Sequence, residues 1–276
     1  MRNLREYYRP ETIDQALELL SREGLHAAPL GGGMQLAAES SGGTEAVVDL
    51  SALPLAYVAT DGAVLRIGGL TRLEEMTRAP ALRAFAGGLV AEAARLNCTS
   101  LLRSQGTLAG TIVSPGAGGE LVSALMALDA EALLQTLEGP ITRHISQLEN
   151  PETFRRAILI EVRLPEPPFA SRIQRERIAR TPGDRAILSV TVIAQVVDGL
   201  IVGCRVAVTG AGLRPMRLRN VETALTGATA QADVIDSVLK KEAASIEMPD
   251  SALASAEYRR AMLPVLISRA VLGSSR

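Results

Sequence analysis

The sequence predicts an α+β fold of two domains. Its 276 residues correspond to about two domains of typical size, and 47% of them are apolar, enough for each domain to bury a core. Short strands and helices alternate with glycine-rich loops until Pro165, Pro167 and Pro168 end the pattern. Strands and then helices fill the remainder. We therefore expect one domain over residues 1–165 and a second over residues 166–276.

The first domain is expected to alternate helices, strands and tight turns. A helix begins at a capping box of Thr12 and Gln15 and carries apolar residues at helical spacing until Gly24 ends it. A second capping box is expected at Thr71 and Glu74. The other elements are expected, in order, as a strand at Ala27–Leu30, a short helix at Gln35–Ser40, strands at Val47–Leu50 and, after an Asp61-Gly62 turn, at Val64–Ile67, helices at Leu89–Arg95 and Leu121–Leu128, a strand at Glu131–Leu137, a turn at Gly139-Pro140 and a strand at Ala157–Leu164.

The second domain is expected to be a small three-stranded antiparallel sheet beside a layer of helices. The β-rich stretches are followed by segments with helical spacing, and Asp198-Gly199 is typical of a tight hairpin. Ser255 is expected to cap the last helix, which Pro264 interrupts. The expected strands are Ser171–Ala179, Ile187–Val197 and Leu200–Val208, and the expected helices are Val221–Leu225, Ala230–Ala244 and Ser255–Leu272.

Composition and charge exclude several classes of protein. The 29 Lys and Arg residues balance 30 Asp and Glu residues, and aromatic residues make up only 3%. The chain therefore lacks both the excess of positive charge and the aromatic side chains for base stacking that are typical of nucleic-acid-binding proteins. No apolar stretch approaches the roughly 20 residues that span a bilayer, and we expect a cytoplasmic protein. Cys98 and Cys204 are expected to be free thiols, and two histidines without paired cysteines provide no metal site.

Two glycine-rich segments point to a ligand with phosphate groups. Gly31, Gly32 and Gly33 lie between a strand and a helix, where a backbone without Cβ atoms can direct several N–H groups at one anion. The second segment, residues 101–121, combines glycines with hydroxyl side chains, is expected to be too small-sided to form a core, and would surround a phosphate or ribose. Alone, the first segment is more typical of a tight turn between strand and helix, and the second could equally be a glycine-rich surface loop or a close crossing of strands. Together they favour a dinucleotide.

Arginines are concentrated at the start of the second domain. Arg172, Arg175, Arg177, Arg180 and Arg185 could form a docking face for another chain, but a solvated strand edge protected by charge explains them better.

Four motifs, in order, resemble the flavoprotein (medium) subunit of the molybdenum hydroxylases, the carbon monoxide dehydrogenase and xanthine dehydrogenase type. PLGGGMQL is similar to the family's AGGT-D-L or AGGHSL loop, and RSQGTLAGTIVSPGAGGEL to its R-N-x-GT-I-GGN-x-x-x-x-P-x-x-D-L segment. ARTPGDRAILSVTV resembles its R-R-x-x-D-x-A-x-V-x-V strand, and SAEYRRAMLPVLISRAVL its terminal S-x-x-YR helix. The resemblance covers essentially the whole chain.

The resemblance implies a fold, a cofactor and partners. Residues 1–165 would form a two-subdomain FAD-binding domain of the PCMH/VAO type, and residues 166–276 the family's C-terminal domain of three strands and a helical bundle. The chain would hold FAD within a hetero-oligomer, in which an iron–sulfur (small) subunit delivers electrons from a molybdopterin (large) subunit. The flavin would pass them to NAD, a quinone or another acceptor. We assign no catalytic acid or base, because the cofactor carries the chemistry.

The same motifs imply which residues hold FAD. The first wall of the site would consist of Gly31, Gly32, Gly33, Met34 and Gln35, and the opposing wall of Thr107, Gly110, Thr111, Ser114 and Glu120, with Glu120 in place of the family's Asp as an acceptor for a flavin or ribose hydroxyl.

Several side chains depart from the family pattern. Met34 replaces Thr or His, Gln35 replaces Asp or Ser, Ala109 replaces the first Gly of GGN and Thr111 replaces its Asn. Four lost contacts at about 1 kcal/mol each would lower the affinity by roughly three orders of magnitude. Two alternatives therefore stand beside an FAD-binding redox subunit: a flavin-free scaffold of the same fold, and an unrelated nucleotide-binding protein.

Overall fold

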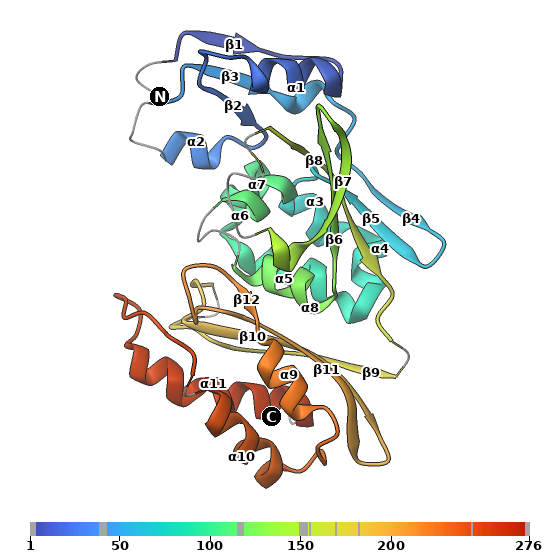
Figure 1. The fold of residues 1–276 in the computed structure, drawn as a ribbon, viewed down its shortest axis with the longest axis vertical. Coiled ribbons are helices and arrows are strands. Elements are labelled where there is room, and N and C mark those ends of the chain that lie inside the picture. Colours follow the sequence, from blue (N-terminus) through green and yellow to red (C-terminus); the bar gives the residue numbers. More distant parts are fainter. Residues whose placement is uncertain are drawn as a thin grey trace.

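The computed structural model describes residues 4–273 apart from 39–42, 115–118, 149–153, 155, 169, 182 and 244. The described helices and strands form three units that follow one another along the long axis of the molecule, with the N-terminal unit at one end and the C-terminal unit at the other (Figure 1). The α+β class is confirmed. The parts of the expected elements at residues 39–40, 115–118 and 244 lie outside the described residues.

The N-terminal unit is a parallel sheet in the order β1-β3-β2. Helix α1 packs its buried residues Ala16, Leu17 and Leu20 in a cluster with Val48 of β3. Thr12 caps this helix by accepting a hydrogen bond from the Gln15 N–H at 3.3 Å, as predicted. The elements are β1 (Glu6–Tyr8), α1 (Ile13–Ser21), β2 (Ala27–Leu30), α2 (Met34–Ala38), β3 (Ala46–Asp49) and the 3-10 turn η1 (Leu50–Ala52).

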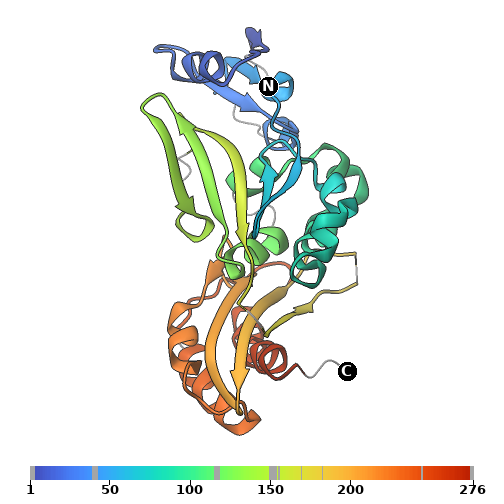
Figure 2. The ribbon, with the colours of Figure 1, turned by 90° about the vertical axis from the view of Figure 1, so that its right-hand side faces the viewer.

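The middle unit is an antiparallel sheet in the order β4-β5-β8-β6-β7. Helices α3 to α5 lie beside this sheet, as the turned view shows (Figure 2). The elements are β4 (Val58–Asp61), β5 (Val64–Gly68), α3 (Leu73–Arg78), α4 (Pro80–Ala84), η2 (Phe85–Gly88), α5 (Leu89–Asn97), α6 (Ser100–Gln105), α7 (Leu108–Val113), α8 (Gly119–Ala127), β6 (Glu131–Thr136), β7 (Gly139–His144), η3 (Ile145–Gln147) and β8 (Ile158–Pro165).

The C-terminal unit is an antiparallel sheet in the order β12-β11-β10-β9, so the described strands number four where the sequence predicted three. The additional strand, β12, has two residues and is too short to produce an alternating pattern. Asp198 (φ 50°) and Gly199 (φ 78°) form the predicted hairpin turn. The elements are β9 (Ser171–Ile178), β10 (Leu188–Val197), β11 (Leu200–Thr209), β12 (Met216–Arg217), α9 (Arg219–Leu225), α10 (Ala232–Ala243) and α11 (Ala256–Leu272).

Strand β10 buries both of its faces, because helices pack on each side of the sheet. Leu188, Val190 and Val192 belong to the cluster that includes helices α9 to α11. Ser189 and Ile193 point the other way, toward helix α8 of the middle unit. Two-sided burial explains why this stretch reads as a nearly continuous apolar run.

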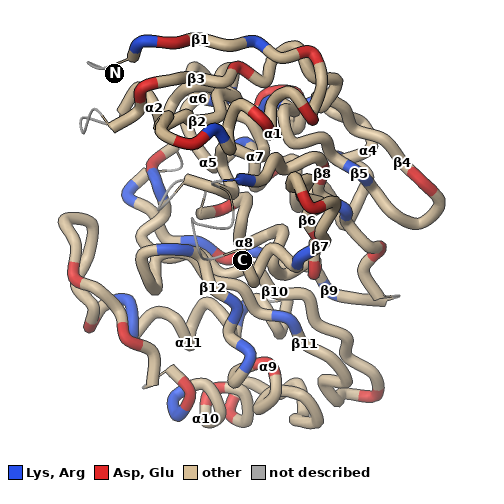
Figure 3. Tube along the Cα trace, turned by 45° about the horizontal axis from the view of Figure 1, so that its top comes forward, with Lys and Arg blue, Asp and Glu red and all other residues tan. Residues whose placement is uncertain are grey.

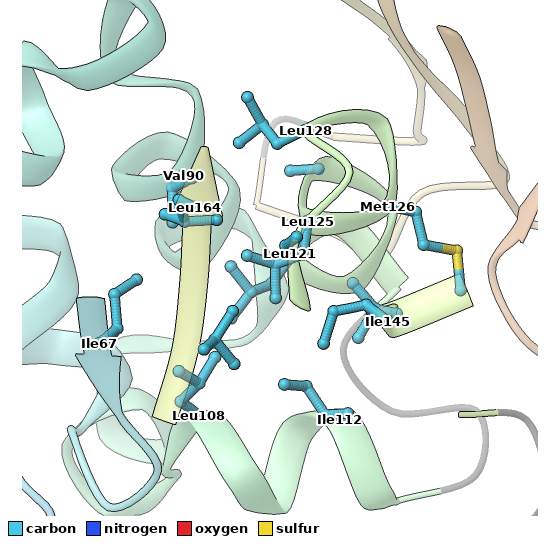
Figure 4. Close-up of a cluster of buried hydrophobic side chains, with 14 of the residues drawn as sticks. Ile67, Val90, Leu108, Ile112, Leu121, Leu125, Met126, Leu128, Ile145 and Leu164 are labelled. Carbon is cyan, nitrogen blue, oxygen red and sulfur yellow. The ribbon is translucent and has the colours of Figure 1, made fainter. Parts of the chain in front are cut away.

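The core of the middle unit includes part of the second glycine-rich segment, contrary to the prediction. Leu108 and Ile112 of α7 are fully buried, and they lie with Leu121 and Leu125 of α8 in one apolar cluster (Figure 4). Helix α7 turns Leu108 and Ile112 into the core and leaves Gly110 exposed, whereas Leu101 and Leu102 of α6 are exposed. The sequence reading gave too much weight to the glycines.

Two local predictions about capping and turns are wrong. Helix α3 is capped at Arg72, whose N–H donates to Glu75 Oε2 at 3.0 Å. Thr71, expected at that position, instead exchanges hydrogen bonds of 3.0 and 2.9 Å with the backbone of Tyr57. Gly139 and Pro140 begin strand β7 rather than forming a turn.

Glu161 of β8 is the centre of a buried polar cluster between strands. Its carboxylate accepts hydrogen bonds from Tyr57 Oη at 2.6 Å, Arg66 Nε at 3.0 Å and Arg163 Nε at 2.7 Å. Burial alone would raise the pKa of this carboxyl, but the bonds from Tyr57 and Arg163, together with both arginine charges, hold it below its ordinary value.

Two arginines of β9, Arg175 and Arg177, connect the C-terminal unit to the rest of the molecule, a role that neither sequence interpretation included. Arg175 pairs with Glu92 of α5 at 3.5 Å, and Arg177 pairs with Glu120 of α8 at 2.9 Å. Both side chains are only 14% exposed. The other three arginines of that set, Arg172, Arg180 and Arg185, are exposed, as expected for a solvated strand edge. Elsewhere, basic and acidic residues are interspersed along the chain (Figure 3). Within the described ranges, no helix has the length and apolar character needed to cross a membrane.

Candidate functional site

A cavity of about 1680 Å³ opens where the three units of the chain meet. Its lining comes from the loop between β2 and α2, from helices α6 and α7, and from two loops of the C-terminal unit at residues 210–213 and 249–253. Pockets for drug-sized ligands occupy roughly 300–1,000 Å³. This cavity therefore has room for a larger ligand, of the size of a dinucleotide.

The first glycine segment leaves backbone donors at this cavity. Gly31, Gly32 and Gly33 follow β2 directly, and Gly33 has the left-handed φ of +74° that favours glycine. Among the described residues, no acceptor receives the N–H groups of Gly32, Gly33 and Met34. Hydrogen bonds from such donors to a charged acceptor contribute about 1.5–3 kcal/mol each. The loop is therefore suited to an anionic group.

The two glycine-rich segments lie directly against each other, as the sequence analysis requires. A Cβ atom on Gly32 would lie 2.0 Å from the carbonyl oxygen of Gln105, and one on Gly31 would lie 3.0 Å from Thr107 Oγ1. Only glycine allows so close an approach at residue 32. Backbone bonds from Leu73 N–H to the Gly106 carbonyl (2.9 Å) and from Leu108 N–H to the Thr71 carbonyl (3.0 Å) fix the second segment in place.

The predicted hydroxyl contacts are used within the protein. Thr107 caps α7 by accepting a hydrogen bond from the Gly110 N–H at 3.2 Å. Thr111 Oγ1 donates to the Thr107 carbonyl at 2.9 Å, and both side chains are 5% exposed. Gly110 and Ser114 lie closer to solvent on the same wall. This wall, like the first, therefore presents mainly backbone to a ligand.

Glu120 lines the cavity and also joins two units of the protein. It is 4% exposed, and its two oxygens accept hydrogen bonds from Arg177 Nε at 2.9 Å and Ser189 Oγ at 2.8 Å. Each carboxylate oxygen has a second lone pair, which leaves capacity for a donor from a ligand. Its predicted bond to a ligand hydroxyl stays a prediction.

Met34 and Gln35 begin helix α2 at the edge of the cavity. Met34 packs over the second segment, where a Cβ on Gly106 would lie 2.7 Å from its Cε. Gln35 is exposed. Met34 thus takes part in holding the two segments together.

Sequence reasoning missed Asn97, at the C-terminal end of α5. Asn97 lines the cavity, and its Oδ1 is buried without a hydrogen-bond partner among the described residues. A buried acceptor left unpaired costs free energy, so a donor from a ligand would satisfy it. No sequence signal marks this residue. The next residue, Cys98, also lines the cavity, and burial raises the pKa of its thiol.

Comparison with known proteins assigns the chain to a family. Residues 2–167 match the model described as "FAD binding domain in molybdopterin dehydrogenase", and residues 175–274 match "CO dehydrogenase flavoprotein C-terminal domain". The chain belongs to this family of flavoprotein subunits. The resemblance stated from the motifs is thereby confirmed, with FAD as the cofactor and an oxidoreductase subunit as the class.

Relatives match along nearly the whole chain. The carbon monoxide dehydrogenase medium chain of Hydrogenophaga pseudoflava is 23% identical over 279 residues, covering 96% of this chain and 95% of the relative. The nicotine 6-hydroxylase medium subunit of Paenarthrobacter nicotinovorans is 27% identical with the same coverage.

Solved structures share the fold. The carbon monoxide dehydrogenase of Hydrogenophaga pseudoflava superposes with a TM-score of 0.87 at 24% identity, covering 96% of this chain and 95% of that chain. Quinoline 2-oxidoreductase from Pseudomonas putida 86 gives 0.85 at 17% identity, covering 98% and 96%.

The described residues fit FAD. The cavity is large enough, the glycine loop offers N–H donors to a pyrophosphate, and Asn97 Oδ1 offers an acceptor to a hydroxyl or N–H group. The described part of the lining has no excess of positive charge, because its arginines are matched in number by carboxylates: Arg22, Arg156 and Arg185 against Glu23, Glu120 and Asp250. The fit depends on backbone groups and on Asn97, which lies outside the family motifs. The substituted motif side chains at residues 34, 35, 109 and 111 therefore do not prevent the site from suiting the cofactor.

Proposed function

We propose that this chain is the electron-transfer subunit of a multi-subunit molybdenum hydroxylase. It would take electrons from the iron–sulfur clusters of a small subunit, to which a molybdopterin-containing large subunit delivers them, and pass them to an acceptor. The observation that carries the proposal is the contact between the two glycine segments at a cavity with unused N–H donors. The names of the medium chains among the relatives support it.

The residues of this chain would bind and orient the cofactor. The N–H groups of Gly32, Gly33 and Met34 would hold the pyrophosphate, and Gly110 and Ser114 would line the opposing wall. Asn97 would accept one hydrogen bond. The chemistry supplied by bound FAD is the acceptance and release of electrons, for which the protein provides position and electrostatics.

We further propose that the domains divide at residues 165 and 166. Pro165 ends β8, and Pro167 and Pro168 lie between β8 and β9. The two matched family regions end and begin on either side of Pro168, at residues 167 and 175. A cytoplasmic location stays a prediction, to be tested by cell fractionation.

A flavin titration of the purified chain tests the central part of the proposal. Quenching of FAD fluorescence and the visible absorption of the complex should give saturable binding of one FAD per chain. Absence of binding at a large excess of FAD would leave the flavin-free scaffold as the function of the chain.

A native pull-down tests the partners. An affinity-tagged chain should co-purify with chains that contain iron–sulfur clusters and molybdopterin, detected by absorption and metal analysis. Recovery of the chain alone, or with chains lacking both cofactors, would contradict the proposed complex.

A further inference from the structure

Arg259 of helix α11 is a buried cation behind the wall of the cavity. The residue is 4% exposed, and its guanidinium donates to the Gly210 carbonyl at 2.6 Å and to Ser251 Oγ at 2.5 Å. Gly210 and Ser251 both line the cavity, whereas Arg259 does not. One side chain therefore ties together two loops of the wall that are about forty residues apart in the chain.

Further contacts hold each of these two loops in place, and the loops in turn fix the position of the Arg259 guanidinium. A Cβ on Gly210, which has a φ of +88°, would lie 2.2 Å from the Ile187 carbonyl, so this residue cannot shift toward β10. Arg214 joins the same loop to α7 by donating to the Ile112 carbonyl at 3.0 Å. In the other loop, Ser251 Oγ also accepts from the Leu253 N–H at 3.2 Å.

The charge of Arg259 is not balanced within the described protein. Both of its acceptors are neutral, no carboxylate among the described residues forms an ion pair with it, and its Nε is buried without a partner. Taking an unpaired cation out of water is costly, and a negative charge nearby offsets that cost more strongly in a protein interior than in water. An anionic ligand in the adjacent cavity would supply such a charge.

We propose that Arg259 is a positioning residue for FAD, which fixes the C-terminal wall of the cavity and favours an anionic ligand through its unpaired charge. The inference rests on the proposed FAD site, and it extends that site to a residue that does not touch the cavity. It also gives the C-terminal unit a part in cofactor binding.

The test compares FAD with riboflavin, which carries the same ring system without phosphate. Dissociation constants are measured by calorimetry and by displacement, for the wild-type chain and for Arg259→Gln, Arg259→Lys and Arg260→Gln. Arg260 is the next residue on the same helix, exposed and outside the cavity lining, so its variant controls for the loss of one positive charge.

Arg259→Gln should weaken FAD binding about tenfold or more and riboflavin binding less than about threefold, because the lost positive charge acts mainly on the anionic ligand. Arg259→Lys should recover most of the preference for FAD, and Arg260→Gln should bind both ligands like the wild type. Ser251→Ala, which loosens the loop without changing charge, should weaken both ligands by the same factor. If Arg259→Gln does not fold, the comparison of FAD with riboflavin is made with Ser251→Ala and Arg259→Lys instead.

The role is refuted if Arg259→Gln binds FAD within threefold of the wild type, or weakens FAD and riboflavin equally. A wild-type chain that binds no FAD would refute the proposed function, and this inference with it. The two failures are therefore distinguished by the wild-type titration.

Discussion

Replacing Gly32 by alanine should abolish tight FAD binding, because the two glycine segments can no longer touch. The new Cβ would lie 2.0 Å from the Gln105 carbonyl oxygen, 2.8 Å from its carbonyl carbon and 3.2 Å from Gly106 Cα. These are backbone atoms, so a side-chain rotation cannot relieve the overlap. Because Cβ contacts shorter than 3.0 Å are essentially never seen, the segments must separate by at least 1 Å.

A separation of this size is enough to break the hydrogen bonds that the loop would make to a pyrophosphate. A bond of about 2.9 Å lengthened by about 1 Å is no longer a hydrogen bond. Each charged bond lost costs about 1.5–3 kcal/mol, which corresponds to roughly a 10- to 150-fold weaker affinity. The overlap itself should cost about 1–3 kcal/mol of stability.

Fluorescence titration with FAD and thermal unfolding with and without FAD provide the measurements. Gly183→Ala is the matched control, since no atom lies within 4 Å of its added Cβ and it is outside the cavity lining. It should bind FAD like the wild type. If Gly32→Ala binds FAD with wild-type affinity, the contact between the segments does not shape the site, and the reasoning fails.

Three further predictions concern single side chains. Asn97→Ala should weaken FAD binding about 2- to 12-fold without lowering the unfolding temperature of the cofactor-free chain, because the lost acceptor, Oδ1, has no partner in the part of the chain that the structure describes. A lower unfolding temperature would contradict this account. Glu161 has a folded-state pKa below its unfolded value, so it stabilises the fold above about pH 4.3 and loses this contribution as the pH falls through the folded-state pKa. The free energy of unfolding, measured in urea, should therefore change less with pH in the acid range for Glu161→Gln than for the wild type. The same change with pH in both proteins would contradict a stabilising ion pair at Glu161. Burial raises the pKa of Cys204 to about 12, so a thiol reagent at pH 8 should leave Cys204 unmodified in the folded chain. Cys98, which is half-buried and lines the cavity, should be labelled faster, and FAD should slow its labelling in a mass-spectrometric time course.

The sequence by itself determined the family, the cofactor and most of the secondary structure. Long patterned stretches such as β10 and α11 were predicted to within a few residues, because burial on fixed faces leaves a periodic signal. Gly31, Gly32 and Gly33 were interpreted as a ligand loop only because a second segment of glycines and hydroxyl side chains accompanied them and both segments resembled the family's motifs. Strand β12 was missed because two residues carry no period.

Only the tertiary structure decided which groups form the wall of the cavity. Thr107 and Thr111 have the chemistry of ligand contacts, yet Thr107 Oγ1 caps the start of α7 and Thr111 Oγ1 donates to the Thr107 carbonyl. Asn97 carries no motif, and Arg259 was noted only as part of the terminal S-x-x-YR helix, without a role. Their roles arise from contacts between residues far apart in the chain. A sequence pattern records the burial of each residue along its own element, whereas a binding site is made where separate elements converge.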